Sequence, residues 1–301
     1  MTAIAVNIAP AHLGRPGWRA WALFSPLVLW LVLFVAAPTV ILLIYSVLEG
    51  AGIGEVARRL TASNFARIFS GTSLRLFARS IEYAGATTVL CALIGYPVAW
   101  FIGRAPLRWR GTLLMLVMIP FMTSFLIRTY AWFIILHEHG LLNGLLESSG
   151  IIPTLFHQPV RLLYTPTAVM LALVYTYLPF MILPIYGSVE KLDGSLIEAA
   201  ADLGAGPARS FFRVILPLTW PGVSAGILMV FVPAIAMFAI TKIMSGGHIR
   251  LIGDEIQEQF EAAGDLPFGA ALGVALLVLF VVIYWATSMR RNGGLLRKIE
   301  G

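Results

Sequence analysis

Long uninterrupted runs of apolar residues decide what this chain can fold into. On a window of ~19 residues, several stretches are long enough to cross the ~30 Å of a bilayer's hydrocarbon at 1.5 Å per residue. Backbone N–H and C=O groups find no partner in lipid, so such runs must form helices or a closed barrel. Barrel strands would alternate apolar and polar residues over ~10 positions, and no such alternation occurs here. The sequence therefore predicts an all-α membrane protein with about six transmembrane helices.

The expected spans form one transmembrane domain over residues 20–289, between an N-terminal tail (1–19) and a C-terminal tail (290–301). Composition agrees, because 59% of the residues are hydrophobic and only 12% are charged, about half of what a soluble domain carries. The first run is far longer than the core of a signal peptide, so we expect it to be retained. The six spans are residues 20–48, 81–103, 111–136, 166–188, 221–244 and 267–289.

Basic residues between the spans predict the orientation. The side that holds both termini carries twelve Lys and Arg residues, and the other side carries seven. Because cytoplasmic loops carry the excess of positive charge, both termini are expected in the cytoplasm. Five of the seven outer arginines lie between the first two spans, where interspersed apolar residues indicate an amphipathic surface segment: Arg58, Arg59, Arg67, Arg75 and Arg79.

The expected outer loop 245–266 is rich in acidic residues. One interpretation is an ordinary solvated face, and the other is a docking or access surface for a partner or a cation. The sequence leaves both open. The acids are Asp254, Glu255, Glu258, Glu261 and Asp265.

Residues 189–220 are too polar to span a membrane and too well patterned for a plain linker. Ser195 and Glu198 have the spacing of a capping box, which predicts that a helix starts there. The glycines that follow end this helix, and Pro207 suits the first position of a second one, which Pro217 is expected to end. The pattern predicts two short helices on the cytoplasmic membrane face, with small residues that leave a shallow surface for another protein.

This segment resembles the EAA motif of the permease subunits of bacterial ABC importers. The matching residues are Glu198-Ala199-Ala200, then Gly204, then Ile215-Leu216-Pro217, at the motif's spacing. The resemblance implies the type I (MetI-like) permease architecture, in which this coupling loop is the socket for the cytoplasmic ATPase. The implied coupling interface comprises Glu198, Ala199, Ala200, Asp202, Leu203, Gly204, Arg209, Ile215, Leu216 and Pro217.

The same resemblance implies the partners: a cytoplasmic ABC ATPase dimer, a second and non-identical permease chain, and a periplasmic solute-binding protein, all at a bacterial inner membrane and without nucleic acid. Lys191, Lys242 and Lys298 all lie outside a P-loop pattern, so ATP and Mg are expected on the ATPase and no cofactor on this chain. Neither Cys91 nor His137-Glu138-His139 has metal-site spacing. We expect a transport subunit with no metal and no catalytic residue.

Other stretches narrow the resemblance to the spermidine/putrescine branch of these permeases. They include Gly95-Tyr96-Pro97, Ile119-Pro120-Phe121, Leu126-Ile127-Arg128 and Pro267-Phe268-Gly269. The resemblance implies a polyamine as the solute. Related branches import opines, amino-acid-derived and other small solutes, and these stay open. Lys242 departs from the branch, which tends to carry an acid there, and a lysine in the pathway would repel a polycation.

Six residues inside the spans or at their outer ends are candidates for lining a translocation pathway. Ionisable residues inside spans are costly and mark pathways, and tyrosine rings can bind amines. The alternatives are snorkelling to the interface and an aromatic belt. An ion-coupled secondary transporter would need buried acids, and no acid falls in the middle of a span. An intramembrane hydrolase would need a nucleophile motif such as G-x-S-x-G on a strand-to-helix turn, and the match at Gly222–Gly226 lies inside an apolar span, where no such turn is expected. The candidates are Glu82, Arg128, Tyr130, Tyr175, Tyr177 and Lys242.

Overall fold

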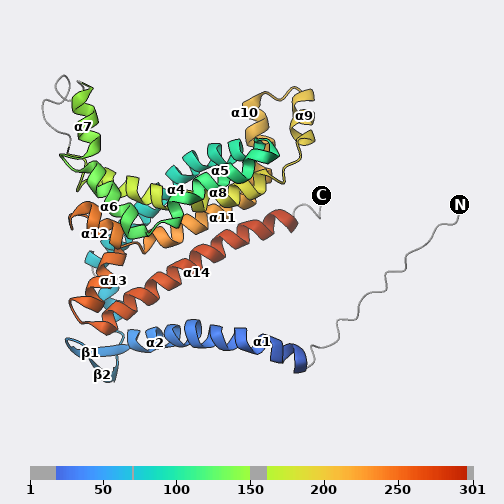
Figure 1. The fold of residues 1–301 in the computed structure, drawn as a ribbon. Coiled ribbons are helices and arrows are strands. Elements are labelled where there is room, and N and C mark those ends of the chain that lie inside the picture. Colours follow the sequence, from blue (N-terminus) through green and yellow to red (C-terminus); the bar gives the residue numbers. More distant parts are fainter. Residues whose placement is uncertain (1–17, 70, 150–160, 297–301) are drawn as a thin grey trace.

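The structure, a computed structural model, describes residues 18–69, 71–149 and 161–296. Almost all of the N-terminal tail and the last five residues lie outside the described part, and with them Arg15, Arg297 and Lys298, which contribute to the orientation argument. Within the described ranges the chain is a bundle of helices with one small β-hairpin (Figure 1).

The first crossing consists of α1 (Trp18–Leu31), a π-helical turn η1 (Val32–Ala36) and α2 (Ala37–Ser46). An antiparallel hairpin of β1 (Leu48–Gly52) and β2 (Glu55–Leu60) follows, then α3 (Ser63–Ile68). The other crossings are α4 (Gly71–Arg104), the pair α5 (Leu107–Met122) and α6 (Phe125–Leu136), α8 (Pro166–Val189), α11 (Leu216–Ile235) and α14 (Leu266–Leu296). Shorter helical segments connect them: α7 (Leu141–Ser148), α9 (Ser195–Asp202), α10 (Pro207–Ser210), η3 (Phe211–Ile215), α12 (Ala239–Ser245) and α13 (Ile252–Glu261).

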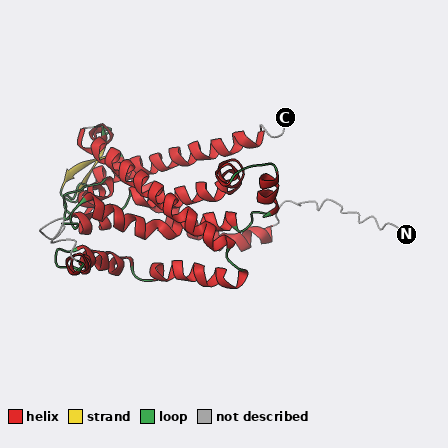
Figure 2. Cartoon of the chain, turned by 90° about the horizontal axis from the view of Figure 1, so that it is seen from above, coloured by secondary structure: helices red, strands yellow, loops and turns green. Residues whose placement is uncertain are grey.

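The bundle has two ends, which we call the hairpin end and the α9 end. The hairpin, α7, α12 and α13 lie at the first, and α9 and α10 lie at the second (Figure 1). The start of α1 and the last turn of α14 both lie at the α9 end, and a view turned by 90° shows the same separation (Figure 2). Five helices are long and apolar enough to cross a membrane by themselves, and the bent pair α5–α6 raises the number to six.

The core is formed by α4, α8 and α11, which pack along most of their length. The buried face of α4 carries small residues, including Ala84, Cys91, Gly95 and Ala99. Small side chains let helix backbones approach closely, which is how helices associate where lipid removes the hydrophobic drive between them.

A second group of elements packs around α14 at the hairpin end. Arg67 of α3 forms an ion pair of 2.8 Å with Asp265, and its guanidinium lies 3.8 Å from the centroid of the Phe268 ring. Asn64 of α3 donates to the carbonyls of Ser46 and Leu48, which ties α3 to the junction of α2 and the hairpin. The arginine-rich stretch is thus a strand, a short helix and the start of α4 rather than one amphipathic segment.

Three helices differ most in kind from the expected spans. The second begins at Gly71 rather than residue 81, because a hydropathy window detects lipid contact and not the polar turns that extend a helix beyond it. The third is broken at Thr123–Ser124, where both residues are extended, into two helices bent by 86°. The fifth stops at Ile235, and α12 continues it only from Ala239.

Close packing of α11 on α8 predicts the effect of a single methyl group. A Cβ at Gly222 would lie 2.3 Å from the carbonyl oxygen of Pro184 and 2.4 Å from Ser188 Oγ. Gly222→Ala should therefore push the two helices apart, cost about 1–3 kcal/mol and lower the unfolding temperature of the purified chain in detergent. The control is Gly187→Ala in α8, where a Cβ meets nothing within 4 Å. Equal unfolding temperatures for the two variants would contradict this account of the packing.

Candidate functional site

The coupling loop protrudes at the α9 end as α9, a tight turn and α10 (Figure 1). The capping box predicted at Ser195 and Glu198 is wrong. Gly194 precedes the helix, Ser195 is its first residue, and no side chain makes the expected cap bond. Instead the Asp193 carboxylate accepts a hydrogen bond of 3.0 Å from the Ser195 N–H, and this bond lowers the pKa of Asp193 below its ordinary value.

Gly204 ends α9 in a left-handed conformation with φ of +78°. The Gly204 N–H donates to the Ala201 carbonyl at 2.8 Å, and the Ala205 N–H donates to the Ala200 carbonyl at 3.0 Å. These two bonds are those of a Schellman motif, which satisfies the last carbonyls of a helix. No atom lies within 4 Å of a Cβ built at Gly204, so the backbone conformation, and not a shortage of space, requires glycine here.

One surface of α9 is open to solvent and combines small residues with exposed leucine side chains. Ala200 is buried, whereas Glu198, Ala199 and Asp202 are exposed. Leu203 is 89% exposed. We call Glu198, Ala199, Asp202, Leu203 and Gly204 the α9 surface; all five belong to the predicted coupling interface.

The second helix of the predicted pair does not end at Pro217. Residues Pro207–Ile235 run as one continuous helix through α10, η3 and α11. Pro217 has no N–H to give to the preceding turn, and that turn is π-helical, which accommodates the missing bond. Ile215, Leu216 and Pro217 therefore begin the fifth crossing, and Ile215 is buried within this chain rather than offered to a partner. Arg209 on α10 is exposed.

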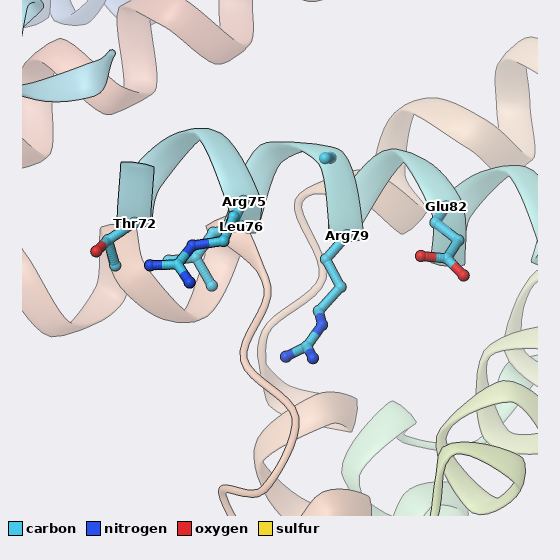
Figure 3. Close-up of a pocket in the computed structure, with 6 residues that line it drawn as sticks. Thr72, Arg75, Leu76, Arg79 and Glu82 are labelled. Atoms are coloured by element: carbon cyan, nitrogen blue, oxygen red, sulfur yellow. The ribbon is translucent and has the colours of Figure 1, made fainter. Parts of the chain in front are cut away.

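Glu82 lies on an exposed face of α4 near the hairpin end. Thr72, Arg75, Arg79 and Glu82 follow one another along this face and line a cavity of about 440 Å³ (Figure 3). Arg79 and Glu82 are one helical turn apart, a spacing at which opposite charges attract. This polar face continues α4 beyond its apolar part, so Glu82 marks the boundary between the two.

Arg128 turns into the protein instead of reaching for the interface. Its residue surface is 9% exposed, and its Nε is buried without a hydrogen-bond partner. The guanidinium carbon lies 5.2 Å from the centroid of the Phe121 ring, across the break between α5 and α6. The opposite face of α6 is apolar and exposed at Ile127 and Ile134. A charge that faces the bundle interior is the arrangement expected of pathway residues.

The three tyrosines have different surroundings. Tyr130 is 54% exposed, on the outward face of α6. Tyr175 meets Trp132 edge to face at 5.5 Å. Tyr177 is buried, and its hydroxyl donates to the Pro233 carbonyl at 3.2 Å, so it satisfies a carbonyl near the end of α11. Tyr177 thus has a structural contact that the sequence did not indicate.

Lys242 lies beside the acidic helix α13. A cavity of about 340 Å³ is lined by Lys242, Arg250 and the acidic residues Asp254, Glu258 and Glu261. The three acids share one face of α13 at a spacing of three to four residues. Arg250 forms ion pairs with Glu255, at 3.0 Å, and with Glu258.

The acidic loop thus separates into two parts. Asp265 belongs to the Arg67 contact, and the others gather around Arg250 and Lys242. Burial raises the pKa of Asp254 to about 6, although the Leu251 N–H bond and the two nearby cations lower it. This carboxylate would gain from a further positive charge nearby.

The structure does not gather the six pathway candidates into one site. Among the described residues, no hydrogen bond, ion pair or ring contact joins Glu82, Arg128 and Lys242 to one another. Nor do any three His, Cys, Asp or Glu side chains in the described ranges lie close enough to hold a metal ion. Sequence reasoning also missed Tyr96 and Thr219, whose hydroxyl groups lie 2.8 Å apart beside η3. The pairing of α4 with α11 brings them together, and no local pattern indicates it.

The conformation of Gly204 predicts how α9 responds to a side chain. Gly204→Ala must adopt a left-handed conformation that costs about 1–2 kcal/mol for a non-glycine residue. Amide hydrogens of α9 should then exchange about 5- to 30-fold faster, as measured by hydrogen exchange and mass spectrometry. Gly206→Ala is the matched control, since Gly206 has φ of −65° and open space. Unchanged exchange in Gly204→Ala would contradict the assigned role of the turn.

Known proteins resemble the chain over nearly its full length. Residues 95–289 match the family described as binding-protein-dependent transport system inner membrane component. The spermidine/putrescine transport system permease protein PotB of Salmonella typhimurium is 41% identical over 266 residues, which cover 87% of this chain and 91% of that protein. The protein of the same name from Escherichia coli is 40% identical over 90% of this chain and 97% of that protein.

Solved structures share the fold. A bacterial ABC transporter that imports the acidic polysaccharide alginate has a chain that superposes with a TM-score of 0.69 at 16% identity, over 91% of this chain and 95% of that one. The expected fold class and function class are thereby confirmed. The chain belongs to the family of binding-protein-dependent inner membrane transport components and is the membrane-spanning permease subunit of a type I ABC importer.

Proposed function

We propose that this permease binds a cytoplasmic ABC ATPase on the α9 surface and passes a small organic cation, a polyamine such as spermidine or putrescine, across the bacterial inner membrane. The α9 surface carries the proposal. A leucine that is 89% exposed beside small residues, on a helix fixed at both ends by hydrogen bonds, suits a pocket on a partner. A few residues that fill well-packed, desolvated pockets carry most of the binding energy at an interface.

The orientation follows from this assignment. If the α9 end faces the cytoplasm, both chain termini are cytoplasmic, because the start of α1 and the end of α14 lie at that end (Figure 1). The hairpin, α7, α12 and α13 then face the periplasm, where a solute-binding protein would dock. An alginate ABC transporter has been solved in complex with its periplasmic protein, and one chain of that structure shares this fold with a TM-score of 0.66.

A second permease chain, not identical to this one, is proposed as the other half of the pathway. Many apolar side chains of the first crossing are exposed, including Phe24, Leu29 and Phe34. Lipid and a neighbouring chain can both cover such a surface. ATP and Mg are assigned to the ATPase, and this chain then acts by changing conformation: the ATPase moves α9, and the helices rock between inward- and outward-open states.

The solute is inferred from the relatives. Two permeases about 40% identical to this chain carry spermidine and putrescine in their names. A second candidate class is favoured by Lys242, which lines the same cavity as Asp254, Glu258 and Glu261. A cavity with both signs of charge suits a solute that bears a carboxylate as well as an amine, such as an opine or another amino-acid-derived compound.

Docking is tested by one substitution on the α9 surface. Leu203→Asp should reduce the ATPase that copurifies with the tagged chain in mild detergent at least tenfold, because a charge replaces the apolar anchor. Leu107→Asp is the control: Leu107 is 79% exposed at the same end of the bundle but lies outside the α9 surface. Recovery of equal ATPase with both variants, or of none with the wild-type chain, would overturn the docking proposal.

The solute class is tested at Lys242. With labelled spermidine, Lys242→Gln should leave ATP-driven uptake unchanged or raise it several-fold, because a repelling charge is removed. For a labelled solute that carries a carboxylate, the same substitution should reduce uptake. Uptake of spermidine by the wild-type importer supports the polyamine assignment. Uptake of only the carboxylate-bearing solute, lost in Lys242→Gln, would replace that assignment with the second class.

A further inference from the structure

A π-helical turn lies between α10, the second helix of the coupling loop, and α11 of the fifth crossing. This turn, η3, covers Phe211–Ile215 and lies between α10 and α11 without a break in the helix. Such turns bond each N–H five residues back rather than four, and they are frequent at functional sites. Because the turn departs from regular α-helical bonding, the side chains that bond or contact it matter for its geometry.

Two hydroxyl groups fix the far end of this turn. Thr219 is fully buried, and its hydroxyl donates to the carbonyl of Ile215, the last residue of η3, at 2.9 Å. The Tyr96 hydroxyl of α4 lies 2.8 Å from Thr219 Oγ1. Since the Thr219 proton is used by Ile215, Tyr96 is the donor of this second bond. The result is a relay from α4 to the carbonyl at the end of η3.

The same tyrosine also contacts the near end of the turn. The Tyr96 ring meets the ring of Phe211, the first residue of η3, edge to face at 5.3 Å between centroids and 83° between planes. One side chain on α4 therefore holds both the first and, through Thr219, the last residue of η3. In the described part of the chain, no other side chain reaches both ends of η3 through ring contacts or hydrogen bonds.

We call these contacts of Tyr96 with the two ends of η3 the clamp. Its mechanical role follows from the elements on either side of η3. Beyond η3, α11 is fixed to α8, because Gly222 and Gly226 have no room for a side chain against Pro184 and Met181. On the other side, α9 packs directly against η3. A cavity of about 530 Å³ lies between α4 and α11 next to the clamp, lined in part by Tyr96 and Phe211. The turn thus lies between α9 and a closely packed helix pair, beside an open groove.

We propose that Tyr96 is a positioning residue for transport: through Thr219 and Phe211 it clamps η3 and makes α4 follow when α9 is moved. The inference rests on the proposed docking of the ATPase on α9. It adds the route by which a movement of α9 reaches α4 in the core. Without the Tyr96 hydroxyl, α9 can still bind the ATPase, but part of its movement is lost in bending η3.

The experiment uses the complete importer, copurified with its ATPase, second permease and binding protein, and reconstituted in proteoliposomes. ATP hydrolysis and uptake of labelled spermidine are measured in the same vesicles for wild type, Tyr96→Phe, Thr219→Val and the double variant. If spermidine is not taken up by the wild type, stimulation of ATP hydrolysis by the binding protein replaces uptake as the readout. The control is Tyr186→Phe, which removes a hydroxyl that donates to Glu190 of the next helical turn at 2.6 Å.

We expect Tyr96→Phe to lower uptake per ATP hydrolysed at least threefold, with the copurified ATPase and the unfolding temperature unchanged. Thr219→Val should have a similar effect, and the double variant should add little, since both remove the same relay. A wild-type ratio in Tyr96→Phe, additive effects in the double variant, or the same fall in Tyr186→Phe would overturn the proposal. Loss of the ATPase from the wild-type complex would instead overturn the docking on which it rests.

Discussion

The rest of this structure depends on the requirement that backbone groups in lipid find hydrogen-bond partners within the protein. That requirement turns each apolar run into a helix, and it makes every interruption a place where free carbonyls or N–H groups need another partner. The observed interruptions meet it in specific ways. Thr219 satisfies the Ile215 carbonyl in the π-helical turn. Tyr177 donates to the Pro233 carbonyl near the end of α11, and Thr123 donates to that of Pro120 beside the break in the third crossing.

The same requirement separates rigid from deformable parts. Glycines let α4 and α11 approach α8 closely. A Cβ atom at Gly95, Gly222 or Gly226 would meet side chains or backbone of α8. The breaks in the third and fifth crossings lie at the hairpin end, and η3 lies at the α9 end. An alternating-access transporter needs this combination, because movement at one end must reach the other without the core coming apart.

The charged groups are placed according to their distance from water. The pair of Arg250 with Glu258 of α13 is exposed on both sides and contributes little to stability, because exposed ion pairs are screened. Arg128 is the contrast, since it is nine-tenths buried and its Nε has no partner. Keeping a buried charge without an ion pair costs stability, and membrane proteins retain such groups where function needs them. This contrast makes Arg128 the strongest of the six pathway candidates.

The sequence alone determined the class of protein, the number of crossings and the coupling motif, because hydropathy and a short motif are local properties of the chain. It placed a helix end at Gly204, since glycine adopts a left-handed conformation without strain. Tertiary structure decided what local patterns cannot: that Asp193 rather than Ser195 caps α9, that Pro217 continues a helix instead of ending it, and that the third crossing bends by 86°. Each of these is a choice between local conformations that the residue pattern leaves open. The Tyr96–Thr219 pair is the clearest case, because 123 residues separate its members in sequence and only the contact between α4 and α11 joins them.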